Sequence, residues 1–433
     1  MPPKDKRKRG HADILSRREL QAEELADSHG FIEAEHEGEK TVDVTQEDIL
    51  AEVELGVTKN KWTEFGLSRG PYTLDFTDDG THLLLAGATG EARLYDLRGR
   101  RRKAGPTEVV RVACNETIRT ARFCYNSACW ALAQKNSLCL YDNEGVRIHD
   151  FDRSDSCTSI DYLPYHFLLV SAKGGRGFIE WRDLSTGKFV GTNQTKYLSP
   201  RKEALRHNRY NGVCYTAHTD GIARLWTPTL KEEALSFFVH GSGTNSVVPF
   251  RDHFLATASN DNVVRIFDIR NPTSSLAVHR LKSTGEVSMD VSQSGLLAIA
   301  QGPRVVIWKD ANRVVVPSAT TETKPVAGSS RGRWTTEDGM YMKHQYVNGL
   351  RFHSVRFRPF EDVLGCGLTQ GMESLIIPGA GYANLDTLDN NPYATNKEKA
   401  RALVRRLLDK LPADTIILNP KAFFSVKKPR IVA

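Results

Sequence analysis

Short apolar runs separated by turn residues recur along most of the chain, each time in the same order. A strand-like run and a turn lead to a more apolar run, then to a Gly/Asn/Asp turn such as "SNDN" or "HTDG", then to an alternating run. The alternating run closes on an aromatic or large apolar residue. Seven units close in this way, at Tyr95, Tyr141, Trp181, Trp226, Phe267, Trp308 and Ile376.

The spacing of these seven positions predicts the architecture. They lie 46, 40, 45, 41, 41 and 68 residues apart, and a period of 40–46 residues with three or four strands is typical of a β-propeller blade. Seven blades around an axis cover the sheet faces that one blade leaves open, whereas two unrelated β-sandwiches would not explain the period. We therefore predict an all-β fold, a seven-bladed WD-repeat β-propeller over residues 57–381, with a loop insertion at 312–345. The repeats are degenerate, since Tyr-Asp or Phe-Asp often replaces Trp-Asp.

Helical periodicity appears ahead of the repeats. In "TVDVTQEDILAEVELG", Thr45 fits an N-cap with Asp48 three residues later, and Ile49, Leu50 and Val53 form an apolar stripe. The residues before this stretch are acidic and helix-prone, a composition that by default stays free in solution. We assign residues 1–56 to a basic start followed by an acidic, helical and partly disordered extension.

A second helical pattern follows the repeats. Thr395 or Asn396 can cap a helix whose apolar stripe is Ala400, Leu403, Val404, Leu407, Leu408 and Leu411. We predict a C-terminal module over 382–433, with an ordered loop and a basic amphipathic helix at 396–411. Burying six such side chains is worth about 10 kcal/mol gross, comparable to the entropy of ordering the helix, so the helix needs a surface to dock on. That surface is the propeller flank or a partner.

The net charge of +7 is unevenly distributed. Residues 1–10 carry +4, residues 11–56 carry −11 and residues 57–433 carry +14. A basic surface suggests a polyanionic partner, although surplus lysine also serves solubility.

Basic residues line both sides of the second helix. Lys397, Arg401 and Arg405 share one side, and a row at this spacing could follow a phosphate backbone or could form an ordinary solvated face. In the tail, two Phe beside basic residues suit RNA stacking or packing on protein. The candidate RNA- or partner-binding residues are Arg401, Arg405, Arg406, Lys410, Lys427, Lys428 and Arg430.

The sequence lacks the common catalytic motifs. The glycine-rich "KGGRG" and "GSSRGRW" do not fit a P-loop, and there is no G-x-S-x-G elbow. The seven scattered cysteines include no C-x-x-C, which favours reduced, mostly buried thiols over a zinc site. His218 and Asp220 fall in blade turns, where turn hydrogen bonds are the expected role. We predict no enzyme activity, no cofactor and no metal, and we find neither a secretory signal nor a membrane-spanning run.

The C-terminal sequence carries a resemblance to a known family. The run "RFRPFEDVLGCGLTQGMESLIIPGAGYANLDTLDNNPY", continued by "NKEKARALVRRLLDKLPADTIIL", closely resembles the C-terminal domain of the U-three-protein-seven-like proteins, nucleolar WD-repeat proteins of the small-subunit processome. The lead-in "GFIEAEHEGEKTVDVTQEDI" looks like the same family, and the resemblance covers roughly residues 31–420. The residues matching the family motif are Gly371, Met372, Glu373, Ser374, Pro378, Gly379, Gly381, Asn384, Asp389, Asn391 and Pro392.

The resemblance implies a function. It implies a non-catalytic scaffold subunit of the small-subunit processome, a pre-ribosome built with the U-three snoRNA, required for early pre-rRNA processing and 18S rRNA maturation. It further implies a place in the nucleus and nucleolus, with processome proteins, pre-rRNA and U-three snoRNA as partners, directly or through neighbours, and with no membrane or small-molecule substrate. The alternative is a generic WD-repeat adaptor, such as the substrate receptor of a ubiquitin ligase.

Overall fold

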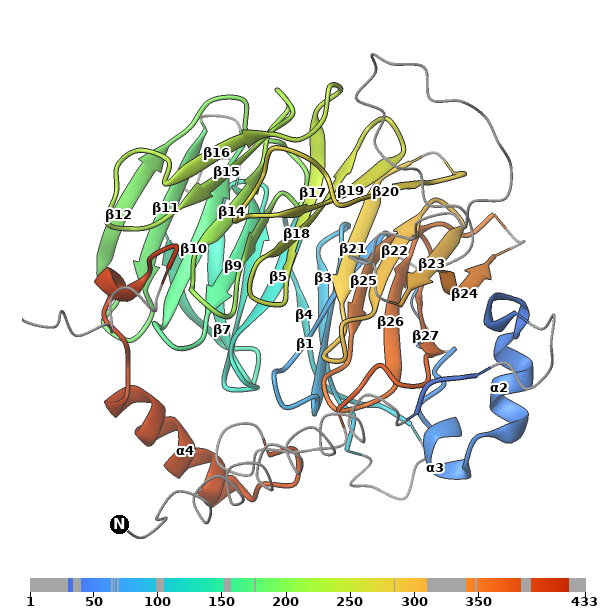
Figure 1. The fold of residues 1–433 in the computed structure, drawn as a ribbon. Coiled ribbons are helices and arrows are strands. Elements are labelled where there is room, and N and C mark those ends of the chain that lie inside the picture. Colours follow the sequence, from blue (N-terminus) through green and yellow to red (C-terminus); the bar gives the residue numbers. More distant parts are fainter. Residues whose placement is uncertain are drawn as a thin grey trace, which may run out of the picture.

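A ring of small antiparallel sheets makes up most of the computed structural model (Figure 1). The structure describes residues 30–33, 40–63, 65, 67, 70–98, 105–151, 157–174, 177–283, 285–309, 340–346, 349–382 and 391–419. The seven sheets are the blades of a β-propeller, which confirms the predicted fold class.

The strands follow the chain order blade by blade. Blades 1–3 contain β1 (Tyr72–Phe76), β2 (His82–Gly87), β3 (Glu91–Asp96), β4 (Thr107–Ala113); β5 (Ile118–Tyr125), β6 (Cys129–Gln134), β7 (Leu138–Asp142), β8 (Arg147–Phe151); and β9 (Cys157–Leu163), β10 (Leu168–Lys173), β11 (Phe178–Asp183), β12 (Phe189–Gln194). Blades 4 and 5 contain β13 (Leu205–His207), β14 (Cys214–Ala217), β15 (Ile222–Trp226), β16 (Leu235–Phe238); and β17 (Thr244–Phe250), β18 (Phe254–Ser259), β19 (Val263–Asp268), β20 (Ala277–Arg280). Blades 6 and 7 contain β21 (Val287–Val291), β22 (Leu297–Gln301), β23 (Arg304–Trp308), β24 (Met340–Gln345); and β25 (Phe352–Phe357), β26 (Val363–Leu368), β27 (Met372–Ile376).

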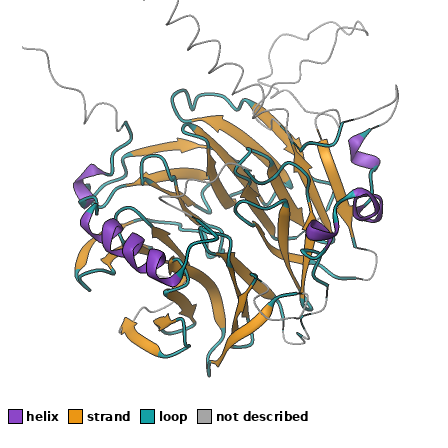
Figure 2. Ribbon diagram, turned by 90° about the horizontal axis from the view of Figure 1, so that it is seen from below, coloured by secondary structure: helices purple, strands orange, loops and turns teal. Residues whose placement is uncertain are grey.

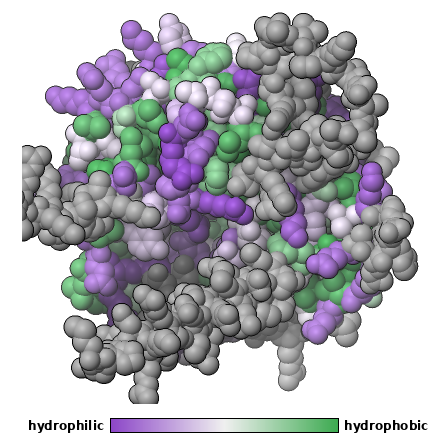
Figure 3. All heavy atoms as spheres, viewed as in Figure 1, coloured by the Kyte–Doolittle hydropathy of each residue, from purple (hydrophilic) through white to green (hydrophobic). Residues whose placement is uncertain are grey.

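Burial falls from the axis to the rim of each blade. Strands β1 and β2 are buried along their whole length, whereas four of the five residues of β8 are exposed. Figure 3 shows hydrophobic residues among hydrophilic ones on the side of the ring seen in Figure 1. Single exposed apolar residues, such as Ile148 in β8 and Phe238 in β16, are normal on a protein surface.

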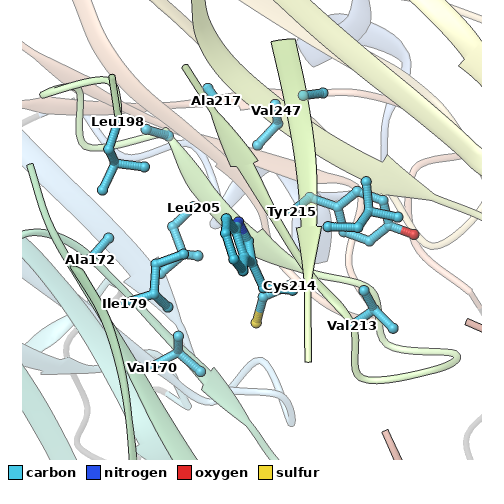
Figure 4. Close-up of a cluster of buried hydrophobic side chains, with 14 of the residues drawn as sticks. Val170, Ala172, Ile179, Leu198, Leu205, Val213, Cys214, Tyr215, Ala217 and Val247 are labelled. Atoms are coloured by element: carbon cyan, nitrogen blue, oxygen red, sulfur yellow. The ribbon is translucent and has the colours of Figure 1, made fainter. Parts of the chain in front are cut away.

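The blades are held together by shared cores. The largest cluster joins blades 3, 4 and 5, and Figure 4 shows Ile179, Leu205 and Val247 of these blades side by side. The largest fully buried side chains of the described residues include three tryptophans, Trp181 and Trp226 in this cluster and Trp130 in the core of blades 1 and 2. Because each core needs two neighbouring blades, a single repeat cannot be stable alone.

The predicted unit ends are confirmed, and one predicted boundary is wrong. Each of the seven positions, from Tyr95 to Ile376, lies at or near the end of the third strand of its blade. The predicted insertion at 312–345 runs too far, because Met340–Gln345 pair with β23 as the fourth strand of blade 6. The rest of the predicted insertion lies outside the described residues.

The histidine of the "HTDG" turn has the structural role expected from the sequence. The indole N–H of Trp226 donates to Oγ1 of Thr216 (2.8 Å), and that hydroxyl is 2.8 Å from Nε2 of His218. His218 Nδ1 lies 2.9 Å from the carbonyl oxygen of Lys196 in the loop that enters blade 4. Burial lowers the pKa of His218 to about 4, so the neutral ring ties strand and loop together.

A ring of charged residues lines the central channel. The innermost strands place one residue each at the same level, in blade order Asp75, Arg122, Asp161, Arg206, Val248, Asp290 and Arg356. Carboxylate and guanidinium alternate around the channel. Because seven positions cannot alternate evenly, one is left over, and the uncharged Val248 occupies it.

Each aspartate of this ring joins two blades. The backbone N–H groups of Phe123, His207 and Phe357 donate to the aspartate of the preceding blade, at 2.9, 2.7 and 2.7 Å. Arg122 also donates to Asp75 at 2.9 Å. Hydrogen bonds from backbone N–H groups to aspartate side chains therefore connect neighbouring blades along the channel wall.

The described helices lie outside the ring. They are η1 (Thr41–Asp43), α2 (Gln46–Glu52), α3 (Leu55–Thr58), α4 (Asn396–Leu408) and η2 (Ala413–Thr415). Figure 2, seen from below, shows α4, the longest of them, lying across the strand ends on one side of the ring. None of the helices in the described ranges is long and apolar enough to cross a membrane.

Candidate interaction surface at the C-terminal module

The outer edge of blade 7 is covered by residues 40–62, which we call the N-terminal clasp. Trp62 and Ser374 exchange two bonds: the Ser374 N–H donates to the Trp62 carbonyl (3.0 Å), and the Trp62 N–H donates to Ser374 Oγ (2.6 Å). The side-chain amide of Gln46 bonds both backbone groups of Ile376, each at 2.9 Å. Blade 7 has three strands within the described residues, and the clasp supplies hydrogen bonds that a fourth strand would make.

The clasp forms because its local structure is well specified. Thr45 and Asp48 make the predicted capping box at the start of α2. Ile49 of the same helix is buried in the core that blades 6 and 7 share, with Leu50 and Val53 partly buried against it. The helix therefore turns its apolar stripe toward the ring and places Gln46 in its first turn at the strand edge.

The first motif residues hold the clasp. Glu373 accepts from Lys61 Nζ at 2.7 Å and also bonds the hydroxyl of Tyr346. Ser374 is fully buried and donates to the Asn60 carbonyl at 2.7 Å. Met372 is buried among the apolar residues of blades 1 and 7, and Gly371, with φ +84°, makes the turn before the strand.

The following motif glycines leave room for neighbouring chain segments. A Cβ on Gly379 would lie 2.6 Å from the ring of Phe31, and a Cβ on Gly381 would lie 2.6 Å from the backbone nitrogen of Glu361. The hydroxyl of Tyr341 donates to the Pro378 carbonyl (2.8 Å) and accepts from the Ile32 N–H (2.9 Å). The motif thus seats residues 31–32 against the end of blade 7.

The end of the motif leads into helix α4. Asn384 and Asp389 lie outside the described residues. Asn391 accepts the N–H of Tyr393 at 2.9 Å, and Pro392 is half-buried in this turn. Thr395 and Glu398 then form a capping box, so of the two predicted caps the structure uses Thr395. The helix ends at Leu408, three residues before the predicted end, because Asp409 takes a non-helical conformation.

Two lysines attach α4 to the ring. Lys399 Nζ lies 2.8 Å from Asp79 Oδ2 in the first turn of blade 1. Lys410 pairs with Asp183 of blade 3 and donates to Ser185 Oγ at 2.7 Å. Burial would raise the pKa of Asp79, but Lys399 and the hydroxyls of Thr77 and Thr81 lower it to about 2.

The residues after α4 are anchored more deeply. Ile416 is fully buried in the core of blades 3–5. Thr415 Oγ1 is 3.0 Å from His166 Nε2, and the amide of Asn211 donates to the Leu418 carbonyl at 3.3 Å. The helix is therefore a strap, fixed at its start on blade 1 and beyond its end on blades 3 and 4.

The strap leaves most of its apolar stripe uncovered by the described residues. Leu403 is half-buried, but Val404 is 57% exposed and Leu408 is 81% exposed. Leu407 and Leu411 are also exposed, at 41% and 39%. The two lysine contacts set the rotation of the helix, so the row with Lys399 and Lys410 faces the ring and the stripe faces away from it.

The candidate basic residues separate into two groups. Arg401 and Arg405 are exposed beside the stripe. Arg406 is half-buried next to Tyr125. Burial raises the pKa of Tyr125, and Arg406 partly offsets this rise. Lys410 is bound to blade 3. Lys427, Lys428 and Arg430 lie outside the described residues.

The face that α4 crosses also holds one mouth of the central channel. A cavity of about 530 Å³ opens there. It is lined by the charged residues of the channel and by turn residues such as Asp78, Asn126 and Pro164. Within the described residues, no group of three or more His, Cys, Asp or Glu could hold a metal ion. All seven cysteines, each in a described range, are free thiols, and five are buried.

The fold and the C-terminal module together define a class of protein. The chain is a WD-repeat propeller with an N-terminal clasp and a C-terminal strap, and residues 340–419 match the BING4CT (NUC141) domain family. A solved structure, the C-terminal WD40 domain of Sif2, superposes with a TM-score of 0.52 at 12% identity, covering 73% of this chain and 98% of that one.

Relatives identify the family within this class. U3 small nucleolar RNA-associated protein 7 of Saccharomyces cerevisiae is 36% identical over 406 residues, covering 93% of this chain and 70% of that protein. WD repeat-containing protein 46 of Homo sapiens is 32% identical over 404 residues, covering 93% of this chain and 61% of that protein. The chain belongs to the family of U3 small nucleolar RNA-associated protein 7.

Proposed function

We propose that this chain is a non-catalytic scaffold subunit of the small-subunit processome, required for early pre-rRNA processing and 18S rRNA maturation. The observation that carries the proposal is the relationship over 93% of the chain to a protein named for its association with U3 small nucleolar RNA. The proposed location is the nucleolus, and the proposed partners are processome proteins, pre-rRNA and U3 snoRNA, reached directly or through neighbours.

The geometry supports a structural role for the ring. The charged groups of the channel bond each other and the backbone: both Arg206 and Arg356 donate to Glu203, at 2.6 and 3.0 Å. Groups engaged in this way join blades and are poor candidates for acid–base chemistry. The outer strands and the loop faces then remain for contacts with other macromolecules.

The basic candidates support a contact with RNA or with an RNA-bound protein. Arg401 and Arg405 project from a helix that two lysines hold against the ring. Such a helix presents its guanidinium groups in a fixed row, which suits phosphate recognition. Lys427, Lys428 and Arg430 would extend the same basic region along the chain.

Depletion of the protein in cells tests the function. We expect pulse-labelled 18S rRNA to fall while large-subunit rRNA persists, and the wild-type chain to restore it. The double variant Arg401→Glu, Arg405→Glu should restore it less well. The control is Lys135→Glu, Lys196→Glu, which changes as many exposed charges on the opposite face of the ring. Normal 18S rRNA in depleted cells would refute the proposal.

A further inference from the structure

Helix α4 presents an apolar stripe that the ring does not cover. Val404 and Leu408, one turn apart, are 57% and 81% exposed, and Arg401 and Arg405 border them. Burying the side chain of a residue such as Leu408 stabilises a contact. A surface of this kind fits an amphipathic partner helix that carries acidic residues along one side.

The chain itself contains a segment with this chemistry. Residues 11–29, outside the described residues, carry five acids against Arg17 and Arg18, a net charge of −3 (2 − 5). Written on a helix, Leu15, Ala22 and Ala26 recur at i, i+7 and i+11 and share one side with Ile14 and Leu25. Its 19 residues match the 13 residues of α4 with length to spare, since α4 is about 20 Å long.

A series of contacts links the start of the described chain to the start of α4. Gly30 lies against Gly379, where an added Cβ would be 3.4 Å from the Gly379 Cα. Two residues on, Gly381 touches the backbone of Glu361, and the neighbouring Pro359 carbonyl touches Gly80. Asp79, next to Gly80, binds Lys399 in the first turn of α4. A continuous series of contacts therefore leads from residue 30 to the helix.

We propose that residues 11–29 dock on the exposed stripe of α4 and cover it within the same chain when Arg401 and Arg405 do not contact RNA or an RNA-bound protein. The acidic residues lie toward the end of the segment, and the basic residues of α4 begin at the start of the helix, so pairing of opposite charges makes the segment run antiparallel to the helix. In this direction, Lys397 and Arg401 face the acidic residues Glu23, Glu24 and Asp27. Further along, Arg405 faces Glu19, and Asp409 faces Arg18. Because the segment and α4 belong to one chain, their contact is intramolecular, and an effective concentration on the order of millimolar compensates for a weak contact.

Hydrogen exchange tests the docking. Three samples are compared: the full chain, the chain without residues 1–29, and the shortened chain with a synthetic peptide of residues 11–29. We expect deletion to speed exchange in α4 about tenfold and saturating peptide to restore it. Leu408→Asp in the full chain should have the effect of the deletion. Ile148→Asp, at an exposed position on β8, is the matched control and should have none.

A charge exchange tests the register. Arg401→Glu with Arg405→Glu should release the segment, as should Glu19→Arg with Glu23→Arg, and the quadruple variant should regain protection. Protection of α4 that is unchanged by the deletion would overturn the proposal. So would a quadruple variant that behaves like its parents. A shortened chain that dimerises through the stripe, seen by light scattering, would assign the surface to a second copy instead.

Discussion

At the scale of single residues, the side-chain amide of Gln46 makes hydrogen bonds that a fourth strand of blade 7 would make. It satisfies the N–H and the carbonyl of Ile376 at once, at the outer edge of the last blade. A buried backbone group left without a partner is expensive, so this side chain matters more than its place in a short helix suggests.

Replacing Gln46 with Ala should therefore lower the free energy of unfolding. Two hydrogen bonds at about 1 kcal/mol each predict a loss of about 2 kcal/mol, measured by urea denaturation. Glu47→Ala, one residue further along and exposed, is the control. Equal stability of the two variants would mean that water replaces the amide without loss.

Asp290 gives the channel a dependence on pH. Burial raises its pKa to about 7, although its carboxylate accepts the N–H of Phe357 at 2.7 Å. In the unfolded chain an aspartate has a pKa near 3.9. Between about pH 4 and 7 the folded protein therefore holds a proton that the unfolded chain has lost, and the stability from this group declines as the pH rises.

The variant Asp290→Asn keeps an acceptor and removes the titration. The difference in unfolding free energy between variant and wild type should grow in favour of the variant from pH 4 to 7, by at most about 1.4 kcal/mol per pH unit, and then level off. Denaturant titrations at several pH values measure it. Parallel curves would show that Asp290 is ionised in the folded state throughout.

At the scale of elements, the attachment of α4 depends on Lys399 near its start and on Lys410 just beyond its end. Removing both by Lys399→Met and Lys410→Met should free the helix, because the ion pairs with Asp79 and Asp183 set its rotation. We expect faster amide exchange in α4, with the melting temperature of the ring unchanged. Lys397→Met, an exposed neighbour, is the control. Exchange that stays slow would place the anchoring in Ile416 alone.

The elements that the sequence predicted are those with local signals. The capping boxes at Thr45 and Thr395 depend on residues three positions apart, and the third strands end on recognisable aromatic residues. The fourth strands of blades 1–6 could not be placed, because exposed strands such as β8 lack a buried face and hence an apolar pattern. The clasp was also beyond prediction, since Gln46 and Ile376 lie 330 residues apart.

The charged ring of the channel did have a local signal. In the first strand of most units, the charged residue follows an apolar residue and precedes an aromatic or apolar one, as in "LDF", "ARF", "IDY" and "VRF". Comparing the units position by position would have revealed the alternation of Asp and Arg. The exposed stripe of α4 had no such signal, because its orientation follows from ion pairs with distant blades.

At the scale of the whole molecule, the family motif lies between the clasp that it contacts and the strap that follows it in the chain. The clasp closes blade 7, the strap crosses the face at the channel mouth, and the family motif joins both. This arrangement explains why the motif is rich in residues that seat other segments. We propose that the contacts with the particle involve the clasp and the strap, which both lie outside the ring.

Sedimentation of a cell extract with and without RNase tests the central claim most directly. As a processome scaffold, the chain should travel with very large particles that contain U3 snoRNA and should shift to light fractions after RNase treatment. A chain that sediments in a small complex, unaffected by RNase and without U3 snoRNA, would contradict the account.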